Sequence, residues 1–500
     1  MIKYIYKTLL LIAIALQAHA QNSKSRQIAH VSISYDATLP TDNVKLTFFD
    51  HQWANDLHGV LQPNIVIGDS SANRFKFVFE SNEDFIFGTF LSINKFGVPT
   101  PIFDNYIVEK GDSVTVRISK YGTRFTGRGM EKYQCTYLIE HAFQSIEDKR
   151  IDSLTAVFEA GNESDYTSIS AYKSRLKENA ERSANKKRAM VEILKKFEGK
   201  VSGKILQLIK AEFLGRFEAE QVSLTFLSYK SLANLPPTVV IKEKKEIEKL
   251  YDLKTLADFT EFDPDVLEIS NGYQRYLYER LKFRSDQKDF GDGFEIIKNN
   301  FSGNLRDKLI TAYVVLSYHR RPDMPKLGKE VLKLVKLDYC REALNNIFSN
   351  RMPGAKAYDF ALQDSSGNVI KLSDFKGKVV VMDFFFTGCV GCWQLNKEMA
   401  NIYSQYQGNP KIAFVSVSID KDINEWKSSL KTNLYTHPHS INLFTNGYGS
   451  LHPIISHYGI IAYPTVLIID KSGKIANGNP PRPSTKEKEK MLVKILKDLM

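Results

Sequence analysis

Apolar and polar positions alternate over short segments in the first part of the chain. The alternation is clearest in five segments: 31–35, 44–49, 74–80, 85–91 and 113–118. Residues that favour turns, such as Gly111-Asp112 and Gly122, separate these segments. A period of two is typical of strands with one buried face. We therefore predict an all-β domain, built as a small sandwich, over residues 27–130.

From about residue 131 to residue 350 the apolar positions follow a helical period. Residues 187–197 and 204–217 place apolar side chains three and four positions apart, which is the spacing of one face of an α-helix. Pro236-Pro237 interrupts this pattern. We predict a helical domain over residues 131–350, whose aromatic side chains form its core rather than a cofactor site.

After Met352-Pro353-Gly354 the two periods alternate along the chain. Three runs are rich in apolar residues, which is typical of strands buried on both faces: 379–386, 411–418 and 465–470. Two runs have the spacing of amphipathic helices: 393–407 and 491–499. Strands that alternate with helices predict an α/β domain with a parallel or mixed sheet covered on both faces, over residues 353–500.

The first twenty residues have a pattern of their own. Lys3 and Lys7 flank the start of an apolar core at residues 9–16, and Ala18-His19-Ala20 has the form of a cleavage site. This is the pattern of a secretory signal peptide, and it is too short for a good membrane-spanning helix. We expect residues 1–20 to be removed and the mature protein, beginning at Gln21, to be exported to the periplasm. An uncleaved membrane anchor is the alternative.

The composition is that of an ordinary globular protein. Of the 500 residues, 43% are hydrophobic and 25% are charged, which excludes disorder over most of the chain. The net charge is +11, but lysines are interspersed with glutamates, as in residues 242–246. Such a pattern is typical of solvated helix faces and does not indicate nucleic-acid binding. With only four cysteines the chain is not a disulfide-stapled scaffold.

Two of the four cysteines, Cys389 and Cys392, lie between a predicted buried strand and a predicted helix. Unpaired backbone N–H groups and the helix dipole favour a thiolate at a helix start, and the thiolate is the nucleophilic form of cysteine. A zinc site would need two further ligands, and no second pair of this spacing exists. A structural disulfide closing so short a loop would stabilise little. We predict a redox-active Cys389–Cys392 disulfide, with no metal and no other cofactor.

The remaining cysteines and a group of histidines are weaker candidates. Cys135 and Cys340 lie at opposite ends of the helical stretch, and in an oxidising compartment they form either a long-range disulfide or two buried thiols. His437 and His439 have the residue type of metal ligands, but histidines in a polar loop more often face solvent. We expect no metal there.

Three groups of residues in the last stretch match a known family. Residues 360–378 have the form of a lead-in hairpin, residues 387–392 take the place of an active-site motif, and Tyr463-Pro464-Thr465 followed by Ile468-Ile469-Asp470 has the form of a cis-proline strand. Through them residues 353–500 resemble the thioredoxin superfamily, specifically its exported TlpA/ResA-like branch. A weaker similarity, through residues 108–112 and 125–127, relates the β domain to a small domain that often precedes such modules.

This resemblance implies a role for each matching residue. Cys389 would attack a disulfide of the partner, and Cys392 would resolve the mixed disulfide. Asp383, six residues before Cys389, would serve Cys392 as a general base; the alternative is a solvent-facing residue at a strand edge. Pro464 would be cis. Tyr463 would pair its backbone with an extended substrate segment, or simply cover the sulfurs.

The chain also departs from the family pattern beside the cysteines. Gly388 stands where many relatives have tryptophan, which removes a bulky wall of the substrate site. Trp393 stands where relatives often have lysine or arginine, and either contacts a partner or packs on the helical domain. The branch often has glutamate where this chain has Leu395. Thr387 is one position away from the peroxiredoxin pattern, so we do not expect a peroxidase.

Together these features predict an exported thiol-disulfide oxidoreductase. Reduction is the favoured direction because the branch mostly reduces, although Val390-Gly391 itself does not indicate a potential. The alternatives are a disulfide oxidase or isomerase, and a binding or chaperone-like module with a secondary redox domain. Expected partners are exported proteins with disulfides or thiols and a membrane-bound electron donor. The sequence leaves open the substrate, the oligomeric state and the role of residues 27–350.

Overall fold

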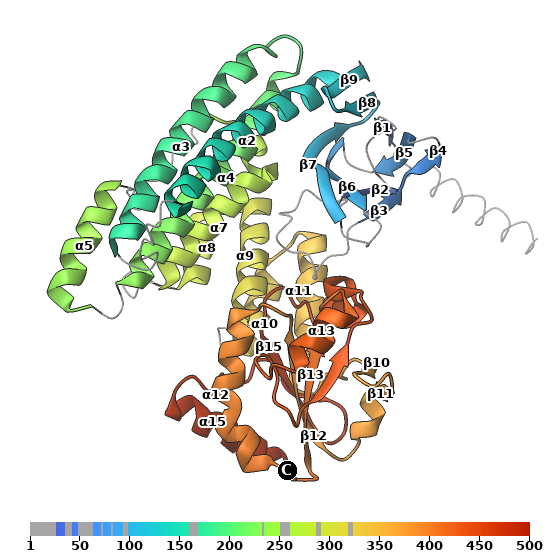
Figure 1. Ribbon diagram of the computed structural model, residues 1–500, viewed down its shortest axis with the longest axis vertical. Coiled ribbons are helices and arrows are strands. Elements are labelled where there is room, and N and C mark those ends of the chain that lie inside the picture. Colours follow the sequence, from blue (N-terminus) through green and yellow to red (C-terminus); the bar gives the residue numbers. More distant parts are fainter. Residues whose placement is uncertain are drawn as a thin grey trace, which may run out of the picture. The chain divides into compact units, whose positions relative to one another are not determined.

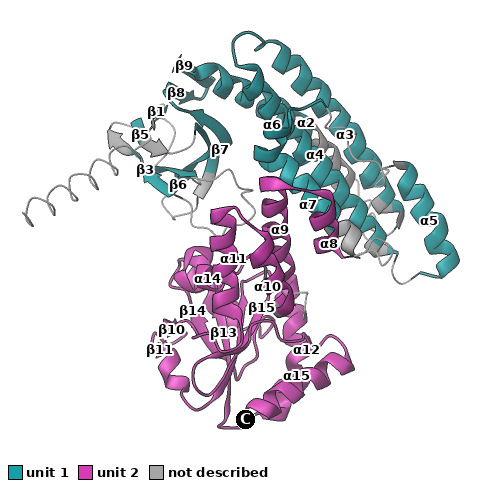
Figure 2. Ribbon diagram, turned by 180° about the vertical axis from the view of Figure 1, so that it is seen from behind, with its two compact units in different colours: residues 1–54, 63–283 teal, residues 55–62, 284–500 magenta. Residues whose placement is uncertain are grey.

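The computed structural model divides the chain into two compact units, one of residues 1–54 and 63–283 and the other of residues 55–62 and 284–500 (Figure 2). It describes residues 27–35, 43–48, 64–71, 74–81, 84–93, 99–159, 169–232, 235–250, 261–286, 292–318 and 324–500. The predicted signal peptide lies outside these residues. Within them, no helix is long and apolar enough to cross a membrane.

Unit 1 begins with two β-sheets (Figure 1). Their strands are β1 (Gln27–Tyr35), β2 (Asn43–Phe48), β3 (Asn64–Ile67), β4 (Asp69–Ser71), β5 (Arg74–Ser81), β6 (Phe85–Ile93), β7 (Pro99–Glu109), β8 (Ser113–Ser119) and β9 (Gly122–Arg128). One sheet has the order β4-β5-β1-β8-β9 and the other the order β3-β2-β6-β7. Alternate residues such as Val31 and Ile33 of β1 and Leu46 of β2 point into one shared core, so the two sheets face each other.

Six helices follow the sheets among the described residues of unit 1, and the last of them runs three residues beyond the end of the unit. They are α2 (Met130–Glu159), α3 (Ile169–Lys195), α4 (Gly203–Ser231), α5 (Pro237–Leu250), α6 (Pro264–Ile269) and α7 (Asn271–Asp286). Two glycines let α4 and α7 approach closely. A Cβ atom on Gly272 would lie 2.1 Å from the carbonyl oxygen of Glu212, and one on Gly215 would lie 2.2 Å from the backbone of Gly272.

The helical stretch predicted as one domain over residues 131–350 is divided between the two units. Helices α8 (Gly293–Asn300), α9 (Gly303–Ser317), α10 (Met324–Leu334) and α11 (Asp338–Arg351) belong to unit 2. The side chain of Arg351, at the end of α11, is buried, and its guanidinium donates to the carbonyl oxygens of Tyr458 and Gly459. The spacing of apolar residues shows which face of a helix is buried, but it does not show which other element covers that face. The sequence pattern therefore did not reveal that the helices belong to two units.

Unit 2 also contains a seven-stranded mixed sheet of order β11-β10-β14-β13-β12-β15-β16. The strands are β10 (Ala361–Asp364), β11 (Val369–Lys371), β12 (Val379–Phe385), β13 (Ile412–Ser418), β14 (Ile441–Phe444), β15 (Thr465–Ile469) and β16 (Ile475–Asn477). β12, β13 and β14 are parallel, whereas β15 runs antiparallel to β12. The predicted α/β domain with a mixed sheet is confirmed.

Helices cover both faces of this sheet (Figure 1). They are α12 (Val390–Tyr406), α13 (Ile423–Leu430), α14 (Pro453–His457) and α15 (Lys486–Leu499). Val379 and Val381 of β12 point to one face, where they meet apolar residues of α12 and α15. Val380, Met382 and Phe384 point to the other face, against α14 and the segment after it. The interior strand β12 is therefore buried on both sides, and it carries the chain directly to the cysteine pair.

Candidate active site

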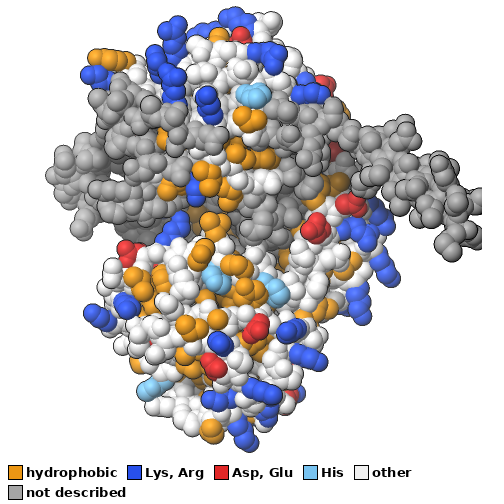
Figure 3. Space-filling model, turned by 90° about the vertical axis from the view of Figure 1, so that its right-hand side faces the viewer, with side chains coloured by type: hydrophobic (Ala, Val, Ile, Leu, Met, Phe, Trp, Pro, Cys, Tyr) orange, Lys and Arg blue, Asp and Glu red, His pale blue; other side chains and the backbone are white. Residues whose placement is uncertain are grey.

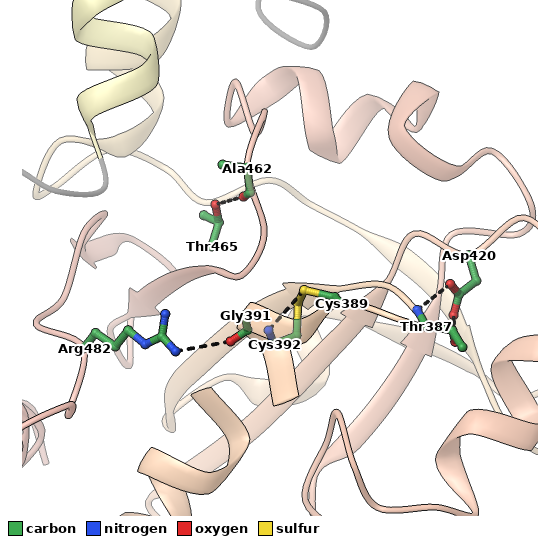
Figure 4. Close-up of a disulfide and its surroundings, with 8 residues drawn as sticks. All are labelled: Thr387, Cys389, Gly391, Cys392, Asp420, Ala462, Thr465 and Arg482. Carbon is green, nitrogen blue, oxygen red and sulfur yellow. Dashed lines mark hydrogen bonds between the residues drawn. A yellow bond between two sulfur atoms is a disulfide. The ribbon is translucent and has the colours of Figure 1, made fainter. Parts of the chain in front are cut away.

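The cysteine pair lies at the N-terminus of α12, where a disulfide joins Cys389 to Cys392 (Figure 4). Cys389 is the N-cap residue of the helix, and its Sγ accepts a hydrogen bond of 3.1 Å from the backbone N–H of Cys392. This bond satisfies one of the N–H groups that a helix start leaves unpaired. The helix begins three residues earlier than its apolar spacing predicts, because a cysteine sulfur takes the capping role usually played by Ser, Thr, Asp or Asn.

Both cysteines are buried in the disulfide form. Cys389 is 4% exposed and Cys392 is 2% exposed, and they pack with Phe385, Trp426 and Phe444. Val390, between them, is 74% exposed. The turn between the two cysteines therefore reaches the surface, whereas the cysteine side chains themselves are buried against the three aromatic rings.

Asp420 holds the loop that leads from β12 to the first cysteine. Its carboxylate is buried and accepts hydrogen bonds of 2.8 Å from the backbone N–H and the hydroxyl of Thr387 (Figure 4). It accepts another bond of 2.8 Å from the hydroxyl of Ser418. Two of these bonds fix Thr387, two residues before Cys389, and the third anchors the carboxylate to Ser418. Nothing in the sequence pattern marked Asp420, because it follows β13 and meets Thr387 only in the folded chain.

Replacing Asp420 with alanine is expected to destabilise the oxidised protein by about 2 to 3 kcal/mol and to slow disulfide exchange, because buried donors lose their acceptor. Denaturant unfolding followed by tryptophan fluorescence measures the first effect. The matched control is Asp422→Ala, which removes the N-cap of α13 but no contact with the cysteine loop. Equal exchange rates in the two variants would show that Asp420 has no part in placing the cysteines.

Asp383 lies on the interior strand β12, beneath the helix that carries the cysteines. Because residues of a strand alternate between faces, it shares its face with Val381 and Phe385. The hydroxyl of Ser416 donates to its carboxylate at 2.6 Å. Burial raises the pKa of Asp383 from its ordinary value of 3.8 to about 7, although the bond from Ser416 lowers it. The alternative of a solvent-facing strand edge does not hold, since β12 lies between β13 and β15.

The peptide bond between Tyr463 and Pro464 is cis, and this turn lies against the cysteine loop. A Cβ atom on Gly391 would be 3.1 Å from Cδ of Pro464 and 3.3 Å from the carbonyl oxygen of Tyr463, so the approach favours glycine. The ring of Tyr463 packs against the cluster of the two cysteines and meets Phe386 edge-on, with 5.6 Å between the ring centroids. Tyr463 thus covers the sulfurs from one side.

The two positions that depart from the family pattern lie beside the cysteines. Gly388 has a φ of 90°, a left-handed conformation that favours glycine, and no atom lies within 4 Å of the place where a Cβ would be. The side next to Cys389 is therefore open. Trp393 is half-buried on α12, and the ammonium group of Lys397 lies 3.7 Å from its ring centroid, a cation–π contact.

Arg482 is a second residue near the cysteines that the sequence pattern did not mark. Its guanidinium donates from Nη2 to the carbonyl oxygen of Gly391 at 3.2 Å (Figure 4). Its Nε donates to the carboxylate of Glu398 at 2.6 Å. It comes from the loop after β16, far along the chain from the cysteine motif. A lone arginine in a proline-rich loop carries no signal of such a contact.

The weaker candidates lie apart from this arrangement. Cys135 and Cys340 are free, buried thiols in different units, and burial raises the pKa of each to about 12. His437 stacks on Tyr403, with 4.4 Å between the ring centroids. In the part of the chain that the structure describes, no group of three or more His, Cys, Asp or Glu side chains could hold a metal ion.

Comparisons with known proteins agree with this geometry. A family model described as Thioredoxin-like matches residues 377–475. The thiol-disulfide oxidoreductase ResA of Bacillus thuringiensis subsp. konkukian is 29% identical over 142 residues, which are 28% of this chain and 78% of that protein. The thioredoxin-like protein YneN of Bacillus subtilis is 28% identical over 146 residues, with the same coverage of 28% and 78%.

Among solved structures, the thioredoxin domain of a thiol-disulfide oxidoreductase from Bacteroides vulgatus is 22% identical. The alignment covers 30% of this chain and 98% of that chain, with a TM-score of 0.25. Each of these alignments covers less than a third of this chain.

The fold, the cysteine pair and the relatives define an enzyme class: this protein is a thioredoxin-like thiol-disulfide oxidoreductase. Within that class its C-terminal domain is similar to the TlpA/ResA-like branch of the thioredoxin superfamily, and the resemblance drawn from the sequence motifs is confirmed.

Proposed function

We propose that this protein is exported and reduces disulfides of other exported proteins through Cys389 and Cys392. The observation that carries the proposal is the cysteine pair itself, placed at the start of α12 beside a cis-proline turn. The pattern of residues 1–20, which is typical of a signal peptide, supports export. The relatives named ResA support the reaction type.

The proposed reaction begins with the reduced pair. The Cys389 thiolate attacks one sulfur of the partner disulfide, a mixed disulfide forms, and the other partner sulfur leaves as a thiolate that takes up a proton. Cys392 then loses its proton to Asp383 and attacks Sγ of Cys389, which releases the second partner sulfur. Two electrons have passed to the partner, and the enzyme is left with the Cys389–Cys392 disulfide. A dithiol donor, which we place at the membrane, restores the reduced pair by the same exchange in reverse.

An exposed apolar surface next to the cysteines supports a protein substrate. Next to the cysteines, Val390 is 74% exposed and Phe386 is 36% exposed. Figure 3 shows further hydrophobic side chains on one face of unit 2. We propose that the open side at Gly388 admits the partner, that the backbone of Tyr463 at the turn before Pro464 pairs with an extended segment of it, and that Trp393 contacts it at the rim. Such a surface binds unrelated partners because backbone pairing does not depend on their side chains.

The reduction potential of the Cys389–Cys392 pair tests the direction of exchange. We expect a reduction potential of about −270 mV, that of thioredoxin. It is measured by thiol alkylation in buffers with known ratios of reduced to oxidised glutathione. A reduction potential of about −120 mV would identify an oxidant and overturn the reductase proposal. The absence of any reversible Cys389–Cys392 disulfide would overturn both directions.

A further inference from the structure

A chain of two hydrogen bonds runs from Arg482 to Cys389 through a single peptide group. Nη2 of Arg482 donates to the carbonyl oxygen of Gly391 at 3.2 Å, and the N–H of the same Gly391–Cys392 peptide donates to Sγ of Cys389 at 3.1 Å (Figure 4). The guanidinium and the sulfur thus lie on opposite ends of one peptide dipole.

The peptide group transmits the effect of the cation to the sulfur. A charged donor on the carbonyl oxygen increases the double-bond character of the C–N bond and draws electron density from the nitrogen. The N–H then becomes a stronger donor, since hydrogen bonds in series polarise one another. A stronger N–H donor favours the thiolate over the neutral thiol at Cys389. The arrangement is therefore suited to the reduced enzyme, in which Cys389 must be ionised to attack.

The loop around Arg482 keeps the guanidinium in place. Nε of Arg482 is bound to the carboxylate of Glu398 on α12, and the two side chains are 39% and 13% exposed. Three prolines restrict the backbone of the loop: Pro480, Pro481 and Pro483. At the base of the loop the side-chain amide of Asn479 donates to the carbonyl oxygen of Tyr318 at 2.7 Å. Because the loop restricts its backbone and Glu398 binds its Nε, the Arg482 side chain loses little further conformational freedom when it binds Gly391.

Other ionisable groups surround the cysteines, so the charge of Arg482 alone does not set the thiolate. Asp383 lies on the strand below, Asp420 binds the loop before Cys389, and Tyr463 covers the pair. The carboxylate of Glu398 offsets the charge of Arg482 at long range. What distinguishes Arg482 from these groups is its direct bond to the peptide that in turn binds Sγ.

We propose that Arg482 is a positioning residue that stabilises the Cys389 thiolate through the Gly391–Cys392 peptide. Its importance for catalysis rests on the proposed reductase function, but its effect on the thiol does not. The residue comes from outside the cysteine motif, so this chain uses a distant loop to tune a site whose Val390-Gly391 dipeptide contains no charged group.

The test is the pH dependence of iodoacetamide alkylation of Cys389 in the reduced full-length protein. In Arg482→Gln the apparent pKa of Cys389 is expected to rise by about 0.5 to 1, so the alkylation rate at low pH falls about three- to tenfold. Arg482→Met, which has no donor at all, should show at least the same rise. Lys397→Gln is the matched control, because it removes a charge from α12 without touching Gly391, and its titration should stay at the wild-type value.

An unchanged titration in either folded Arg482 variant overturns the proposal. So does an equal shift in the Lys397 control, since the effect would then be one of general charge. Near-UV circular dichroism shows whether each variant is folded. If Arg482→Gln does not fold, the titration of Arg482→Met is the test. Failure of the reductase function appears elsewhere: wild-type protein would not reduce a protein disulfide, while the alkylation titration would still report on Arg482.

Discussion

Replacing Cys389 with serine is expected to abolish disulfide exchange, with the rate of protein-disulfide reduction falling by at least about a thousandfold. A serine hydroxyl neither ionises near neutral pH nor forms a disulfide, so the first attack cannot occur. Reduction of insulin disulfides, with a chemical dithiol as electron source, measures the loss. The buried thiol Cys135 lies in the other unit, so Cys135→Ala is the matched control and should keep the wild-type rate.

This experiment also separates the enzyme from a binding module. If the main task were partner binding, Cys389→Ser would retain both partner binding and the effect of the protein on those partners. Exchange that persists in the serine variant would show that another thiol is the nucleophile, and Cys392 would be the first candidate because it is the only cysteine in contact with Cys389 among the described residues.

Replacing Asp383 with asparagine is expected to have two opposite effects. The first is on activity: release of the partner from the mixed disulfide should slow on the order of a hundredfold at neutral pH, because Cys392 loses its base. In the wild-type protein the release rate should rise as pH increases through about 7, the pKa of Asp383, since only the ionised carboxylate accepts the proton. The asparagine variant should lack this rise. Stopped-flow measurement of release across pH 5 to 9 tests both statements.

The second effect of Asp383→Asn is on stability, and its sign is opposite. In the unfolded chain Asp383 ionises near 3.8, whereas in the folded protein its pKa is about 7. Between these values the folded state holds a proton that the unfolded state lacks, so the free energy of unfolding falls as pH rises from about 4 to 7. Asparagine cannot ionise. The oxidised variant should therefore be more stable than wild type by about 2 to 4 kcal/mol at pH 8, with no gain below about pH 4.

Denaturant unfolding at pH 8 and at pH 4 measures this difference. Ser416→Ala is a useful companion variant, because it removes the bond to the Asp383 carboxylate without removing the carboxylate itself. It should raise the pKa of Asp383 further and move the rise in release rate to higher pH. A loss of activity in Asp383→Asn without any gain in stability at pH 8 would mean that burial of the ionised carboxylate does not destabilise the folded protein.

Much of the C-terminal domain was predictable because its signals are local. Continuous apolar runs correctly predicted β12, β13 and β15 to within a residue or two, since a strand buried on both faces has no polar alternation. The start of α12 was less accurate, because its cap is a cysteine sulfur and not one of the usual capping side chains. Along residues 131–350 the helices were predicted as a class, but the division of the stretch between two units was not.

By itself the sequence predicted the chemistry of this protein, because the spacing of Cys389 and Cys392, the strand before them and the motif around Pro464 follow from neighbouring residues in the chain. Only the tertiary structure decided which distant residues lie beside the cysteine pair. Asp420 and Arg482 reach Thr387 and Gly391 from loops that are distant in sequence. The physical reason is that periodicity and capping record interactions over a few residues, whereas a carboxylate or a guanidinium acts on whatever group the fold brings within hydrogen-bonding distance.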